Sequence, residues 1–225
     1  MYRGRFGFFL AIAAVAIPVD IATAAVDEWA SDPADGERQT LFLLMTVVQL
    51  AFTLLVSAAI VTAAAAQARG GEATFADAYA NALDRFSTLW WASFRVLFHV
   101  FLFAITIIGI PWAVQRFVRW LFVEQTAVLE GVNTKDALAR SADVVIGRWW
   151  QTLGLAFVVW LVVFVPNILV TAAVWGVPVA VGGPIGAIVA AVTAPVFAIG
   201  MTLLYFDLQA HKAPETTVPQ GLAPA

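Results

Sequence analysis

The sequence lacks cysteine and has few charged residues. Without cysteine the chain can form no disulfide, thiolate nucleophile or cysteine-ligated metal site. Only 12% of the 225 residues are charged and 62% are hydrophobic, whereas soluble domains carry about 25% charged residues. These values indicate an integral membrane protein.

Recognisable catalytic motifs are also missing. The sequence contains no Gly-x-Ser-x-Gly elbow, His-Glu-x-x-His helix or phosphate-binding glycine loop. The two histidines, His99 and His211, lie too far apart in the predicted topology to form a metal pair. We therefore expect no enzymatic activity, metal or cofactor, and the lipid bilayer rather than a nucleic acid as the principal partner.

Long uncharged runs predict the membrane spans. The 58 residues between Arg148 and Asp207 contain no Asp, Glu, Lys or Arg, and one crossing needs about 20 apolar residues. This run therefore crosses twice, with a turn in the Gly- and Pro-rich segment 176–184. We predict an all-α polytopic membrane protein with about six transmembrane helices, at roughly 7–25, 41–67, 89–110, 112–130, 149–174 and 181–206.

The distribution of basic residues predicts the orientation, because cytoplasmic segments carry an excess of Lys and Arg. With six spans, one side receives Arg3, Arg5, Arg69, Arg85, Lys135, Arg140, Arg148 and Lys212. The other side receives the acidic segment "DEWASDPADGER". We therefore expect a multi-pass protein of the cell membrane with both termini in the cytoplasm. Residues 1–212 form a single membrane domain, and the Pro-rich residues 213–225 form a disordered cytoplasmic tail.

The first span has two interpretations. The segment "MYRGRFGFFLAIAAVAIPVDIATA" has a basic start, an apolar stretch and an Ala-Thr-Ala ending at Ala24, which also fits a cleavable signal peptide. Asp20 fits poorly in a signal peptide and favours a retained span.

Two segments resemble each other, 59 positions apart. "DAYANALDRFSTLWW" (77–91) and "DALARSADVVIGRWW" (136–150) share two aspartates, two alanines and a terminal pair of tryptophans. Thr74 and Asn133, each three residues before an aspartate, are expected N-caps. Polar residues gather on one stripe of each helix and apolar residues on another. We interpret both as cytoplasmic amphipathic helices at the membrane interface, either structural elbows between spans or binding surfaces for a headgroup or partner protein.

Charges inside a span are costly and need a partner or a purpose. Spans three and four form a predicted hairpin about residues 110–111, and counting from this turn places Glu124 level with residue 97. Arg95 and His99 flank that level on one helical face. We therefore predict a contact between Glu124 and Arg95 or His99.

Two further arginines lie nearer the outer surface of the predicted fourth span. Arg116 and Arg119 are three residues apart, and Asp20 of the first span lies at a similar depth, which predicts an ion pair. Such a pair either holds helices in register or forms part of a pocket for phosphate or another anion, since paired arginines suit bidentate recognition.

The later part of the chain, about residues 87–212, resembles a known family. "PWAVQRFVRWLFVEQTAVLEG", "DALARSADVVIGRWWQTLG" and "TLLYFDLQAHK" are similar to the membrane domain found fused to glycerophosphoryl diester phosphodiesterases and also as stand-alone proteins. Gln209 stands where a basic residue is more usual. The positions that carry the resemblance are Glu130, Arg140, Ser141, Gly147, Trp149, Trp150, Tyr205 and Asp207.

The resemblance implies a membrane module associated with glycerolipid metabolism, without phosphodiesterase activity, because the spans leave no room for the catalytic barrel. We therefore expect a non-enzymatic scaffold or accessory module in membrane lipid-related processes, with lipid headgroups or a partner membrane protein as its contacts. The alternative is a transporter or lipid-handling protein. Its predicted intramembrane polar cavity is lined by Arg95, His99, Arg116, Arg119 and Glu124.

Overall fold

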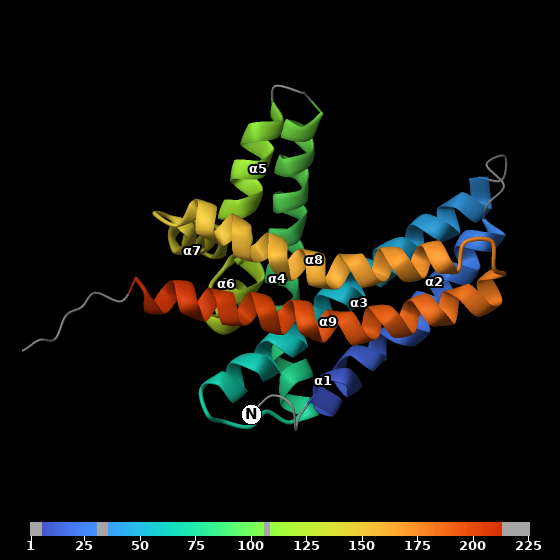
Figure 1. Cartoon of the computed structure of the whole chain (residues 1–225), viewed down its shortest axis with the longest axis horizontal. Helices are drawn as coiled ribbons and strands as arrows, with labels where there is room; N and C mark the ends of the chain where they lie inside the picture. Colours follow the sequence, from blue (N-terminus) through green and yellow to red (C-terminus); the bar gives the residue numbers. More distant parts are fainter. Residues whose placement is uncertain (1–5, 31–35, 106–108, 213–225) are drawn as a thin grey trace, which may run out of the picture.

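The computed structural model describes residues 6–30, 36–105 and 109–212, and all the regular elements in these ranges are helices (Figure 1). In chain order they are α1 (Phe6–Ala13), the 3-10 helix η2 (Ala14–Ala16), α2 (Ile17–Trp29), α3 (Gly36–Ala68), α4 (Phe75–Ala104), α5 (Ile110–Arg119), α6 (Val123–Leu129), α7 (Thr134–Val145), α8 (Trp149–Ala173) and α9 (Val179–Ala210). The predicted tail, 213–225, lies outside the described residues.

Five helical stretches of the described chain are long and apolar enough to cross a membrane. They are Phe6–Trp29, Gly36–Ala68, Phe75–Ala104, Trp149–Ala173 and Ala180–Ala210. The all-helical membrane class predicted from the sequence is confirmed. The predicted span 112–130 differs, because it consists of two short helices, α5 and α6, separated by a turn at residues 120–122.

The broken segment nevertheless returns along α4. Arg85, near the beginning of α4, donates from Nη1 to the carbonyl oxygen of Gly131, just after α6, over 2.9 Å. The two helices α5 and α6 therefore bring the chain back to the end of the molecule at which α4 starts. Gly131 has a φ of +64°, a backbone conformation that favours glycine, and a Cβ there would also come within 2.9 Å of Arg85 Nη2 and displace that side chain.

The two segments that resemble each other fold differently. Both predicted N-caps are confirmed, because Thr74 accepts from the backbone of Asp77 and Asn133 accepts from the backbone of Asp136. The first segment does not form a separate surface helix, since α4 continues without a break from Phe75 to Ala104. In the second segment α7 and α8 are separate, and Gly147, with a φ of +86°, lies in the turn between them.

The core has two parts. In one, Phe9 and Ile12 of α1 are completely buried against α3, α4 and α9, and the Tyr79 hydroxyl donates to the Ile12 carbonyl oxygen over 2.8 Å. In the other, Phe122 and Tyr205 pack together where α9 meets the α5–α6 turn and α7. The first helical stretch is thus an integral part of the bundle.

Much of the apolar surface remains exposed. Large hydrophobic side chains face outward along α8 and along the far part of α4, where α4 and α5 project from the rest of the bundle (Figure 1). Contiguous apolar surface of this extent is expected where a helix faces lipid rather than water. At the start of α8, Trp150 is 78% exposed, as expected for a side chain at the membrane boundary.

Candidate functional site

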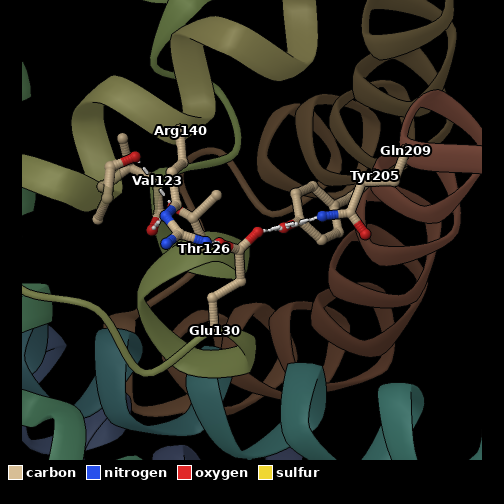
Figure 2. Close-up of polar contacts among 7 residues, drawn as sticks. Val123, Thr126, Glu130, Arg140, Tyr205 and Gln209 are labelled. Atoms are coloured by element: carbon tan, nitrogen blue, oxygen red, sulfur yellow. Dashed lines mark hydrogen bonds and ion pairs between the residues drawn. The ribbon is translucent and has the colours of Figure 1, made fainter. Parts of the chain in front are cut away.

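Glu130 joins three helices at one end of the bundle (Figure 2). It follows α6, and its Oε2 accepts a hydrogen bond from Nη1 of Arg140 on α7. Its Oε1 accepts from the hydroxyl of Tyr205 and, over 3.1 Å, from Nε2 of Gln209, both on α9. Gln209 Nε2 also lies 2.6 Å from the Tyr205 hydroxyl oxygen. We call these four residues the Glu130 junction; it satisfies both oxygens of a carboxylate that is only 19% exposed.

Two hydroxyl groups next to this junction stabilise the break between α5 and α6. The buried Ser141 hydroxyl donates to the carbonyl oxygen of Arg119 over 2.9 Å and accepts from the backbone N–H of Phe122 over 3.1 Å. The Thr126 hydroxyl donates to the carbonyl oxygen of Ala137 over 3.0 Å. Both contacts hold α7 against the α5–α6 segment, and Ser141 supplies partners that an unbroken helix would have provided.

The structure brings together only some of the positions that carry the family resemblance. Glu130, Arg140 and Tyr205 meet in the Glu130 junction, and Ser141 lies next to it. The other four positions lie elsewhere. Gly147 forms a turn, and Trp149 packs against the second part of the core with its Nε1 buried. Trp150 is exposed, and Asp207 lies beside His211 on the surface of α9, 3.7 Å from its Nδ1.

The predicted pairing of Asp20 with Arg116 or Arg119 is wrong. Asp20 Oδ1 instead accepts from Nε2 of Gln49 on α3, over 2.9 Å. Arg116 stacks over the Trp120 ring, with 5.4 Å between the guanidinium carbon and the ring centroid. The reason is spatial: α5 packs with α4, α7 and α8, so similar depth does not bring its arginines near α2.

The predicted contact of Glu124 with Arg95 or His99 is also wrong. His99 contacts the Trp120 ring and its Nδ1 lies 2.7 Å from the Arg95 carbonyl oxygen, while Glu124 lies beside Ser57 of α3. The predicted depth of Glu124 holds only if residues 112–130 form one unbroken helix. The turn at 120–122 breaks that helix and changes the direction of the side chains that follow. As a result Glu124 faces Ser57 of α3 instead of Arg95 or His99 of α4.

Glu124 borders a cavity of about 980 Å³ between α2, α3 and α9. A smaller cavity of about 270 Å³, on the α4 side, also reaches Glu124. The polar side chains that line the larger cavity are Asp20 and Asp27 of α2, Gln49, Thr53 and Ser57 of α3, Glu124 of α6 and Thr171 of α8. Most of the remaining lining is Ala, Gly and Val. The cavity therefore combines a polar wall with small apolar walls.

Two periodic patterns in the sequence indicate this cavity, although the positions of the charged residues alone did not predict it. Gln49, Thr53 and Ser57 recur every four residues within the uncharged run 39–68, which puts them on one stripe of the helix. Gly182, Gly186, Ala190 and Ala194 form a matching stripe of small residues on α9, and all four line the cavity. A polar stripe opposite a small-residue stripe predicts a space between two helices that polar groups line.

The fold and the cavity define an all-helical polytopic membrane protein with a largely apolar cavity that has one polar wall. Within the described ranges, no three His, Asp or Glu side chains are placed to hold a metal ion together. Comparison with protein-family models, with curated proteins and with solved structures found no match.

Proposed function

We propose that the protein binds an amphipathic molecule in the cavity between α2, α3 and α9, and so acts in lipid handling or transport within the membrane. The observation that carries this proposal is the cavity itself, about 980 Å³ in volume, with Asp20, Gln49, Ser57 and Glu124 along it. Sites for small molecules have volumes of about 300–1,000 Å³, mostly apolar walls and a few polar groups.

The composition of the walls fits an amphiphile. The apolar residues of α9 suit a hydrocarbon chain, whereas the stripe Gln49, Thr53 and Ser57 offers hydrogen bonds to a polar group. Polar side chains inside a membrane are costly unless they serve a pathway or a binding site.

Obstruction of the cavity tests this function. A Cβ at Gly186 meets nothing within 4 Å, so Gly186→Phe places a ring in open space. Gly154 on α8 has equally open surroundings and does not line this cavity, so Gly154→Phe is the matched control. We expect Gly186→Phe to lower the amount of lipid or other amphiphile that co-purifies several-fold, as measured by mass spectrometry, and Gly154→Phe to leave it unchanged. Equal amounts in both variants and in the wild type would contradict the proposal.

A scaffold or accessory role, in line with the resemblance to the phosphodiesterase-associated membrane domain, is the second candidate. It is favoured by the Glu130 junction, where the charges of Glu130 and Arg140 pair with each other. Crosslinking in native membranes tests it with Glu130→Gln and Gly186→Phe. A partner protein lost only in Glu130→Gln supports the scaffold, and unchanged partners in both variants contradict it.

A further inference from the structure

The charges that line the cavity have one sign. Asp20, Asp27 and Glu124 all line it, and the described residues that line it include no Lys, Arg or His. The basic residues of the neighbouring hairpin lie elsewhere, since Arg116 stacks on Trp120 and His99 contacts the same ring. The cavity therefore favours a cationic occupant over an anionic one.

The carboxyl groups are also incompletely satisfied. Glu124 Oε1 is buried and has no hydrogen-bond partner among the described residues, and the Ser57 hydroxyl is the neighbour that interacts with this carboxyl group. Asp20 Oδ1 accepts a single hydrogen bond, from Gln49. A buried polar oxygen without a partner is costly, so binding of a ligand that donates to it is favoured.

From this geometry we infer that the amphiphile carries an amine or ammonium group, which the carboxylate groups of Glu124 and Asp20 hold in the cavity. This inference rests on the proposed function, because it names the chemical class of the same ligand. A primary ammonium group donates up to three hydrogen bonds and supplies the missing positive charge, and its alkyl part fits the Ala and Gly walls of α9. A bare metal ion fits less well, since it needs about six oxygen ligands and the described carboxylates are not grouped to supply them.

Dodecylamine and dodecanol, which share a twelve-carbon chain and differ in headgroup, provide the test. We expect dodecylamine to bind the purified full chain about tenfold more tightly than dodecanol, a difference of about 1.4 kcal/mol, because a hydrogen bond to a charged group is stronger than one between neutral groups. Ligand-dependent thermal stabilisation in detergent measures both affinities. In Glu124→Gln we expect this preference to disappear, while dodecanol binding stays the same.

Each other outcome has a definite meaning. Equal binding of both compounds in the wild type, lost in Gly186→Phe, overturns the amine inference and leaves the proposed function standing. Binding of both that is unchanged in Gly186→Phe overturns the proposed function. Stabilisation by sodium chloride but not by choline chloride, lost in Glu124→Gln, overturns the inference in favour of an inorganic cation. If Glu124→Gln does not fold, Asp20→Asn replaces it, because its side-chain oxygen can still accept from Gln49.

Discussion

Glu130 and Ser141 show how single side chains hold this membrane bundle together. Glu130 binds donors from α7 and α9, and Ser141 binds two backbone groups at the α5–α6 turn. Inside a bilayer no water is present to form a hydrogen bond with an unsatisfied backbone group. Such contacts therefore contribute more to stability there than on the surface of a soluble protein.

Tyr205 and Glu130 are expected to be energetically coupled. Tyr205→Phe removes one donor to Glu130 Oε1. Glu130→Gln removes the negative charge of the carboxylate to which Tyr205, Gln209 and Arg140 all donate. We expect each variant to lower the free energy of unfolding by about 1–3 kcal/mol. The double variant should lose about 0.5–3 kcal/mol less than the sum, because both changes disrupt one network. Unfolding in mixed micelles measures all three values, and strict additivity would show that the two side chains act independently.

Ser141→Ala tests the turn between α5 and α6. The substitution leaves the Phe122 N–H and the Arg119 carbonyl oxygen without this partner in a buried setting. We expect a loss of about 1–3 kcal/mol in the free energy of unfolding. Ser87→Ala, at an exposed serine of α4, is the control and should change stability by less than about 0.5 kcal/mol. A Ser141→Ala effect as small as that of the control would mean that the turn does not depend on this hydroxyl.

At the scale of the elements, local signals predicted helix ends better than helix breaks. Thr74 and Asn133 cap α4 and α7 as expected, because a cap depends on residues within one turn. The break between α5 and α6 falls at Trp120, Leu121 and Phe122, with no Pro or Gly to mark it. Ser141, about twenty positions later, supplies its hydrogen bonds, so a reading of the local sequence could not find it.

Gly147 lies in the turn between α7 and α8, and we expect this position to require glycine. Its φ of +86° is unfavourable for a residue with a Cβ, so Gly147→Ala should lower the free energy of unfolding by about 1–2 kcal/mol. Gly154→Ala, within α8, should instead raise it by up to about 1 kcal/mol, because alanine favours a helix. Thermal unfolding in detergent compares the two variants. Stabilisation by both substitutions would show that the α7–α8 turn tolerates another backbone conformation.

On the scale of the whole molecule, several chain segments meet at one end. Arg69, just after α3, lies over the Phe206 ring of α9 at 5.7 Å, Glu130 contacts α7 and α9, and Arg85 contacts Gly131. The ends of α3, α6 and α9 and the starts of α4 and α7 therefore share this end. It contains Arg69, Arg85 and Arg140, which the sequence assigns to the cytoplasm, and the orientation stays a prediction.

The absence of cysteine allows a direct test of this topology. Lys135→Cys and Lys212→Cys, at exposed positions of the basic end, should react with a membrane-impermeant maleimide only when the cytoplasmic side is accessible. Glu28→Cys, at the end of α2, should react only from the opposite side. Labelling of intact and opened cells compares the three variants, with the unlabelled cysteine-free chain as the control. Reaction of Lys135→Cys and Glu28→Cys from the same side would show that α5 and α6 together do not cross.

The sequence by itself determined the membrane class, four of the predicted spans almost to their ends and the two helix caps, because hydrophobic length and capping act over neighbouring residues. Only the tertiary structure decided the partners of the polar side chains. Asp20 meets Gln49 rather than an arginine, because α5 packs with α4, α7 and α8 and not with α2. Glu124 borders a cavity rather than a histidine, because the turn at 120–122 changes the direction of the side chains that follow it. The Glu130 junction likewise joins residues up to 79 positions apart, a distance that no local pattern spans.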